Sequence, residues 1–179
     1  MLQKYNRWKV LAVFFDNPRP VGSGFQLREI SRMTGIAPPS VKKYLDEFAD
    51  EKLIIATRQR VQGYPVYWAN REDERFRLFK KMNTILSIHD SGLLNYLNDE
   101  CTPGAVILFG SASRGEDLLE SDIDLFLLCS ETKLNLGRYE KALKRKINLL
   151  FSKDIKSLSS ELKNNILNGV ILSGYLTVF

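Results

Sequence analysis

The sequence is poor in the residues that build disulfides and zinc sites, with two cysteines, Cys101 and Cys129, and one histidine, His89. Two cysteines in a chain of 179 residues make no disulfide framework, so we expect two small buried side chains in a reducing, cytoplasmic compartment. A single histidine without a Cys/His cluster gives no support to a zinc site. No run of about 18 apolar residues occurs, so we expect no membrane span.

Positive charge is concentrated in the first half of the chain, although the net charge is only +5. Residues 1–81 carry sixteen Lys/Arg against nine Asp/Glu, a surplus of +7, whereas residues 82–179 carry ten against twelve, a balance of −2. A basic half of this kind indicates a polyanionic partner, with nucleic acid as the first candidate. A solvated basic surface that binds no partner is the alternative.

Hydrophobic spacing and turn residues predict three helices and a β-hairpin before residue 70. Asn17-Pro18 ends the first helix, Gly35 ends the second, and Pro38-Pro39 suit the first turn of the third. The predicted helices cover residues 3–16, 26–34 and 38–51, and the predicted strands cover residues 53–60 and 65–69.

This part of the chain resembles winged helix-turn-helix domains, through the segments 27–36, 40–45 and 51–54. The resemblance covers residues 3–70 and implies a DNA-binding domain at residues 1–70 whose second motif helix enters the major groove. A dimerisation or protein-binding module is the alternative. The residues expected to face DNA are Ser40, Lys42, Lys43 and, as a further candidate, Asp46 on the helix, with Arg58, Gln59, Arg60 and Gln62 at the hairpin tip.

A long helix at residues 71–89 is predicted to link this domain to a second one, within a linker of residues 71–91. We expect its apolar stripe, formed by Phe76, Phe79, Met82 and Leu86, to pack. The second domain covers residues 92–179 and alternates helices with strands. Its predicted strands are 105–109, 122–129 and 146–151, and its predicted helices are a short one before residue 102 and two at 137–145 and 159–168.

The most distinctive segment of the second domain is Gly110–Asp124, which lies between the apolar runs Ala105–Phe109 and Leu125–Cys129. Apolar runs of this length, bounded by turn residues, are typical of buried strands. The free N–H groups of a helical turn after the first strand favour an anion. Asp122 and Asp124 are two residues apart, so strand alternation places both carboxylates on one face. Paired carboxylates beside a phosphate-binding loop suit a Mg²⁺-nucleotide site.

The spacing of Gly110-Ser111 and Asp122-x-Asp124 resembles the signature of minimal nucleotidyltransferases of the DNA polymerase beta-like superfamily. The resemblance implies an α/β domain with a small mixed sheet, which makes the whole chain a two-domain α+β protein. It also implies that Gly110, Ser111 and Arg114 contact the phosphates of ATP or another NTP. Asp122 and Asp124 would bind Mg²⁺ and act in catalysis. The alternatives are turn capping for the two aspartates and a surface role for Arg114.

Active members of this superfamily carry a third carboxylate on the next core strand, and the matching residue in this chain is Asn148. An amide cannot act as a base and is a poorer ligand for a hard cation. Asp154, Glu140 and Glu131 are the nearest other carboxylates, and sequence does not say whether any of them reaches the site. If Asn148 is the only residue at the position of the third carboxylate, we expect a protein that binds nucleotide without turnover.

Two functions therefore stay open. The first is an enzyme or former enzyme that binds Mg-NTP and transfers a nucleotidyl group to a protein hydroxyl, as relatives that act as antitoxins do to a toxin of the HEPN ribonuclease family. The second is a DNA-binding transcription regulator whose second domain senses nucleotide or binds a partner. Autoregulation of its own operon by an antitoxin would combine both, and a structural adaptor is a third function. A homodimer is one candidate for the oligomeric state, which the sequence does not decide.

Overall fold

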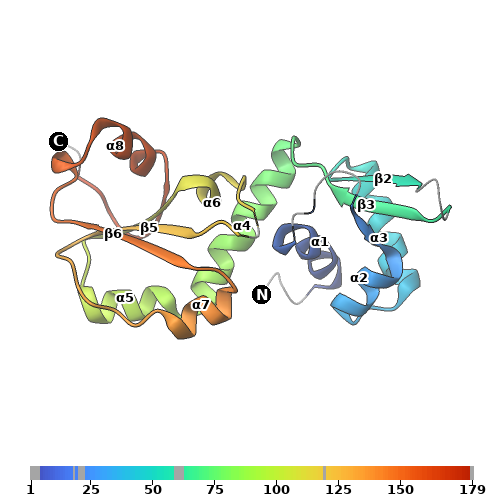
Figure 1. Ribbon diagram of the computed structural model, residues 1–179, viewed down its shortest axis with the longest axis horizontal. Coiled ribbons are helices and arrows are strands. Elements are labelled where there is room, and N and C mark those ends of the chain that lie inside the picture. Colours follow the sequence, from blue (N-terminus) through green and yellow to red (C-terminus); the bar gives the residue numbers. More distant parts are fainter. Residues whose placement is uncertain (1–4, 18, 20–22, 59–62, 119, 178–179) are drawn as a thin grey trace. The chain divides into compact units, whose positions relative to one another are not determined.

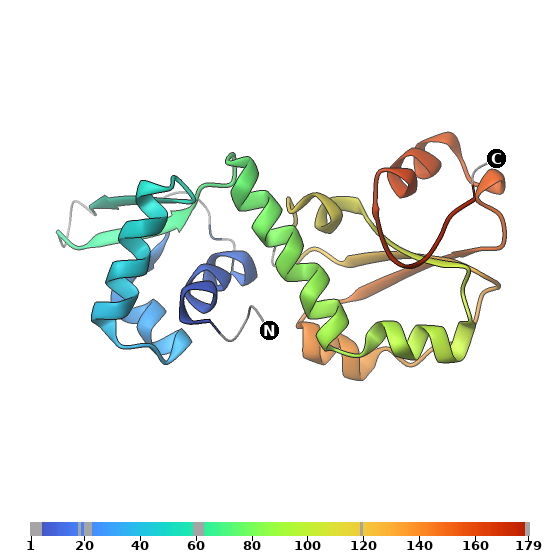
Figure 2. The ribbon, with the colours of Figure 1, turned by 180° about the vertical axis from the view of Figure 1, so that it is seen from behind.

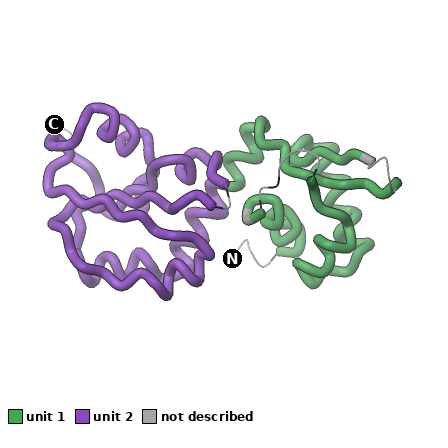
Figure 3. Tube along the Cα trace, in the orientation of Figure 1, with its two compact units in different colours: residues 1–80 green, residues 81–179 purple. Residues whose placement is uncertain are grey.

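The computed structural model describes residues 5–17, 19, 23–58, 63–118 and 120–177, and it divides into two compact units, residues 1–80 and 81–179 (Figure 3). Each unit combines helices with a small β-sheet, as the predicted α+β class requires. The division falls within one long helix, Glu74–Asp90 (α4), which the sequence analysis assigned to a linker of its own.

Among its described residues, the first unit contains three complete helices, the first part of α4 and a three-stranded sheet (Figure 1). The sheet is antiparallel, with strand order β1-β3-β2, and a two-residue strand pairs with the hairpin predicted from sequence. Gly35 ends the second helix in the left-handed conformation at φ 70°. The elements are α1 (Asn6–Asp16), β1 (Phe25–Gln26), α2 (Leu27–Thr34), α3 (Pro38–Asp50), β2 (Ile54–Arg58) and β3 (Pro65–Ala69).

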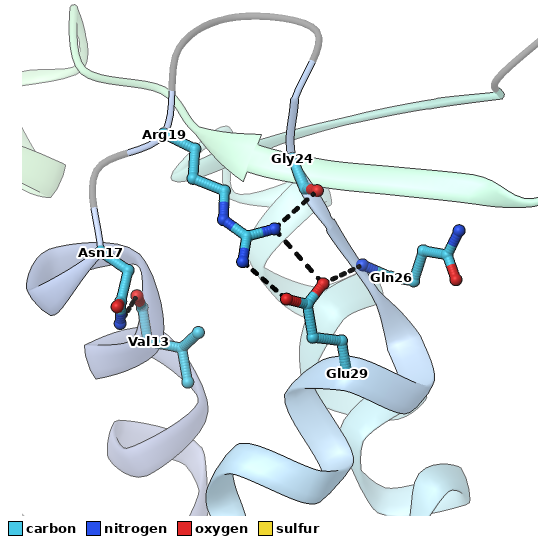
Figure 4. Close-up of polar contacts among 6 residues, drawn as sticks. All are labelled: Val13, Asn17, Arg19, Gly24, Gln26 and Glu29. Carbon is cyan, nitrogen blue, oxygen red and sulfur yellow. Dashed lines mark hydrogen bonds and ion pairs between the residues drawn. The ribbon is translucent and has the colours of Figure 1, made fainter.

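A cation–carboxylate pair ties the segment after α1 to the beginning of α2 (Figure 4). Arg19 donates to both carboxylate oxygens of Glu29, at 2.6 and 3.3 Å, and to the carbonyl of Gly24 at 3.3 Å. The guanidinium also lies 3.8 Å from the ring centroid of Phe25. The carboxylate of Glu29 is in turn within 3.5 Å of the backbone N–H of Gln26, which precedes α2. These contacts hold the beginning of α2 and strand β1 against the segment that follows α1.

The second unit contains a four-stranded mixed sheet with strand order β6-β5-β4-β7. β5 and β6 are parallel, whereas β4 pairs antiparallel with both β5 and β7. After α4 the elements are α5 (Leu93–Cys101), β4 (Ala105–Phe109), α6 (Gly110–Arg114), β5 (Ile123–Leu128), α7 (Gly137–Leu143), β6 (Ile147–Ser152), a 3₁₀ turn (Ile155–Ser157), α8 (Ser160–Leu167) and β7 (Val170–Gly174).

Both faces of this sheet are covered, which explains why β4 and β5 read as continuous apolar runs. α5 and α7 lie on one face and α6 and α8 on the other, and the view from behind agrees (Figures 1 and 2). Alternate residues of β5 accordingly belong to different cores. Leu125 packs with the core that contains α5 and α7, whereas Phe126 packs with Ile166 of α8. Asp124, two residues before Phe126, therefore belongs to the face that carries α6 and α8.

The prediction that α4 packs through a single apolar stripe is wrong in part. Phe76 is buried in the core of the first unit, but Met82 is 36 % exposed. Near its end the helix instead contributes Ile88 to the core of the second unit. Because Phe76 and Ile88 lie on different sides of the helix, no single stripe describes its packing. None of the helices in the described part of the chain is both long and apolar enough to cross a membrane.

Candidate functional site

The first part of the site is the sharp transition from β4 to α6. The predicted loop at Gly110-Ser111 is itself the first turn of a five-residue helix that follows β4 directly. Gly110 has a positive φ of 71°, and a Cβ built on it would lie 2.5 Å from Oδ2 of Asp124. Glycine is therefore required here for its backbone conformation and for close approach to Asp124. Ser113, which is 3 % exposed, closes the turn by donating to the Gly110 carbonyl at 2.7 Å.

The second part of the site is the beginning of β5, where Asp124 lies within the strand and Asp122 lies just before it. Asp124 is half-buried and sits in register with Phe109 of β4 on one side and with Asn148 of β6 on the other. Asp122 directly precedes the strand and is exposed. Gly110 and Asp124 are thus brought together at one end of the central strand pair.

The third part of the site is the amide of Asn148, which is in direct contact with the carboxylate of Asp124. Nδ2 of Asn148 donates to Oδ1 of Asp124 at 3.1 Å. An ionised carboxylate only accepts hydrogen bonds, so the contact uses the one property that an aspartate at this position would lack. The parallel register of β5 and β6 pairs Asp124 with Asn148, the residue that the resemblance matched to the third carboxylate.

Two of the three alternative carboxylates, Asp154 and Glu140, already accept hydrogen bonds from backbone N–H groups. Asp154 caps the 3₁₀ turn by accepting from the backbone N–H of Lys156 at 2.8 Å. Glu140 accepts from the backbone N–H of Ile147 at 3.1 Å. Glu131 is exposed. Among the residues that the structure describes, no group of three or more His, Cys, Asp or Glu side chains is arranged to hold a metal ion.

The side chains available as metal ligands determine how many metal ions the site could bind. Mg²⁺ commonly takes one or two carboxylates and fills its remaining positions with water and substrate phosphates. Asp122 and Asp124 supply two carboxylates, a ligand chemistry that suits one such ion. A second ion and a general base would need a further carboxylate, and the amide of Asn148 does not fit that role.

Arg114 and Ser111, the other predicted phosphate ligands, lie at the surface of α6. Arg114 donates to Glu116 at 2.8 Å, and both side chains of this pair are about half exposed, at 51 % and 43 %. An ion pair this exposed contributes little stability, so Arg114 can exchange Glu116 for a phosphate at small cost. Ser111 is partly exposed, and its carbonyl accepts from the backbone N–H of Glu116 at 3.1 Å.

Sequence reasoning missed one residue that holds the segment before Asp122. Arg145 donates from Nη1 to Asp117, from Nε to the carbonyl of Ser121 and from Nη2 to the carbonyl of Asp122, at 2.7, 2.7 and 2.9 Å. Its only sequence signal is a basic residue shortly before the strand that carries Asn148, in a segment with several other basic residues.

The residues predicted to face DNA divide into three groups. Ser40, Lys42 and Lys43 are exposed on α3, opposite the buried Val41, Leu45 and Phe48. Lys42 pairs with Asp46 one turn later, and this hydrogen bond raises the pKa of Lys42 while neutralising part of its charge. Arg58 is the last residue of β2. Arg60, Gln59 and Gln62 lie outside the described residues.

Two further basic residues on the first unit escaped the sequence analysis. Arg28 and Arg32 are exposed and one helical turn apart on α2. Like Lys43, neither forms an ion pair with another residue of the described chain. Their four-residue spacing within a helix-turn-helix pattern was the signal that could have identified them.

Comparison with known proteins identifies the second unit. Residues 92–176, a little under half of the chain, match the family model described as "Polymerase beta, Nucleotidyltransferase". This region is a nucleotidyltransferase-like domain. The match runs from just before α5 to just after β7 and includes every residue of the candidate nucleotide site. No curated protein and no solved structure matches the chain.

Proposed function

We propose that the protein is a DNA-binding regulator whose nucleotidyltransferase-like domain binds a Mg²⁺-nucleoside triphosphate with little or no turnover. The observation that carries this proposal is the hydrogen bond from Asn148 to Asp124. A carboxylate at that position could share a second metal ion and accept a proton from an attacking hydroxyl. The amide of Asn148 can do neither, whereas the chain retains the residues that the proposal assigns to triphosphate binding.

In this proposal the nucleotide binds at the end of the sheet where α6 begins. Asp122 and Asp124 hold Mg²⁺, which when bound neutralises charge on the phosphates. The backbone N–H and hydroxyl of Ser111 donate to the phosphates, and Gly110 keeps the approach open because it has no side chain. Arg114 leaves Glu116 and pairs with a phosphate oxygen. Asn148 holds Asp124 in place by its hydrogen bond.

We also propose that the first unit is a winged helix that binds DNA. Two features support this: the order of three helices and an antiparallel hairpin, and exposed basic residues on α2 and α3. Lys43, Arg28 and Arg32 would contact phosphates, and Ser40 would face the base edges. Lys42 would contribute less than Lys43, because Asp46 already pairs with it.

A second function, nucleotidyl transfer to a protein hydroxyl, is favoured by the intact pair Asp122 and Asp124 beside Gly110-Ser111. The acceptor oxygen would attack the α-phosphorus, and pyrophosphate would leave. A toxin of the HEPN type is the partner that the resemblance implies. This function requires a base for the hydroxyl proton from outside the three residues Asp122, Asp124 and Asn148.

Labelling separates the two functions. The full-length protein is incubated with Mg²⁺, ATP labelled at the α-phosphate and a co-expressed partner, in parallel with the variant Asp122→Ala. We expect the wild-type protein to bind labelled ATP reversibly, the variant to lose binding, and no protein to become covalently labelled. Covalent label that depends on Asp122 would establish transfer and contradict the proposal. Absence of any ATP binding would remove both functions.

DNA binding is tested by the salt dependence of affinity for a random-sequence duplex. The variant Lys43→Ala should bind more weakly, with its salt slope reduced by about 1. Lys153→Ala is the matched control, because it removes an exposed lysine from the nucleotidyltransferase-like domain. Equal losses in the two variants would show that only net charge matters and would contradict an interface on α3.

A further inference from the structure

Arg145 joins three parts of the segment that leads into β5. Each nitrogen of its guanidinium has its own acceptor: Nη1 donates to the Asp117 carboxylate, Nε to the Ser121 carbonyl and Nη2 to the Asp122 carbonyl. The distances are 2.7, 2.7 and 2.9 Å, within the range of well-formed hydrogen bonds.

The two charged side chains of this cluster are shielded from solvent. The side chain of Arg145 is 12 % exposed and that of Asp117 is 3 % exposed. Solvent competes poorly for donors and acceptors at such exposure, so the guanidinium fixes the backbone geometry that it contacts. Only arginine offers a planar fork that reaches three acceptors at once, since the lysine ammonium is a compact point charge.

The backbone beside Arg145 reaches the same segment. The carbonyl of Lys146 accepts from the N–H of Ile123 at 2.9 Å, which begins the pairing of β5 with β6. Two residues further along β6, Asn148 contacts Asp124. A short stretch of chain therefore supports Asp122 through Arg145 and Asp124 through Asn148.

We propose that Arg145 is the positioning residue of the metal site, because it holds the backbone carbonyl of Asp122 and so limits where the Asp122 carboxylate can lie relative to Asp124. This inference builds on the proposed Mg²⁺-nucleotide site and concerns a residue that does not touch the ligand. Residues that orient metal ligands from behind typically change metal affinity by about 10- to 100-fold when they are replaced.

The first variant, Arg145→Lys, keeps the positive charge beside Asp117 and loses the fork. The second, Arg145→Met with Asp117→Leu, removes the buried pair as a whole and so leaves no unpaired buried carboxylate. Lys141→Met is the control, because Lys141 is an exposed basic residue on the preceding helix, α7. Circular dichroism and thermal unfolding establish that each variant is folded before binding is measured.

The measurement is the dissociation constant of ATP with and without Mg²⁺, by titration calorimetry on the full-length protein. We expect both Arg145 variants to weaken Mg²⁺-dependent binding by about 10-fold or more, with Arg145→Lys the milder, and to change ATP binding without Mg²⁺ much less. The control should bind as wild type. A folded double variant with wild-type Mg²⁺-dependent affinity would overturn the positioning role alone. A wild-type protein that binds no Mg²⁺-ATP would instead overturn the proposed site, and this inference with it.

Discussion

Replacing Asn148 with aspartate reverses the contact on which the functional proposal depends. In the wild-type protein the amide donates to Asp124 at 3.1 Å. In the Asn148→Asp variant, the new carboxylate would face the carboxylate of Asp124 with no hydrogen-bond donor between them. Two like charges about 4 Å apart repel by about 1 kcal/mol in bulk water and by about 4 kcal/mol at an effective dielectric constant of 20. Because Asn148 is exposed and Asp124 only half-buried, the lower end applies.

The lost hydrogen bond adds about 1 kcal/mol, so we expect Asn148→Asp to lower the free energy of unfolding by about 2 kcal/mol without divalent cations. Mg²⁺ should restore this stability, because it binds between carboxylates in the folded protein only. Asn148→Ala separates the two effects, since it removes the hydrogen bond without adding charge. Asn165→Asp is the isosteric control at an exposed position on α8.

The assay is urea unfolding with EDTA and with Mg²⁺. An Asn148→Asp protein that is as stable as wild type in EDTA and indifferent to Mg²⁺ would refute the reasoning, because Asp124 would then not lie in a shared carboxylate site. The same variant should also gain nucleotidyl transfer if the amide is what limits turnover. A wild-type protein that already transfers as fast as the variant would contradict the assignment of Asn148.

Three further predictions concern Gly110, Cys129 and the two exposed arginines of α2. Gly110→Ala should lower the free energy of unfolding by about 1–3 kcal/mol in urea titration and abolish Mg²⁺-ATP binding, because its φ is 71° and its Cβ would meet Asp124 at 2.5 Å. Burial, with the neighbouring thiol of Cys101, raises the pKa of Cys129 to about 11. Cys129 should therefore be alkylated roughly 100-fold more slowly at pH 8 than an ordinary thiol, and faster as the pH approaches 11, as mapped by peptide mass spectrometry. Arg28→Ala with Arg32→Ala should weaken DNA binding more at low salt than at high salt, by anisotropy.

Sequence reasoning located most of the elements, because local signals coincide with them, but it did not predict strands β1 and β7. Gly35 ends α2, and the apolar runs of β4 and β5 are buried on both faces of a sheet. These features depend on neighbours along the chain or on strand period alone. The position of Asn148 came instead from the family resemblance, which places a third carboxylate on the next core strand, and the structure pairs Asn148 with Asp124.

Other features depend on contacts between segments that sequence does not reveal. The close approach of Gly110, the first residue of α6, to Asp124 of β5 depends on packing between segments, and it gives that glycine a role that spacing could not show. Arg145 looked like one of several basic residues, although it is the one that reaches Asp117. α4 was read as a single apolar stripe, because sequence does not show that it contributes to two separate cores.

The central claim is that Asp122 and Asp124 form a Mg²⁺-nucleotide site that binds without efficient turnover. The most direct test is to measure ATP binding by calorimetry with Mg²⁺ and with EDTA, and then to recover the nucleotide and identify it. We predict binding that requires Mg²⁺ and release of intact ATP. Binding that is unaffected by EDTA, or rapid conversion of bound ATP to pyrophosphate and a covalent adduct, would contradict the claim.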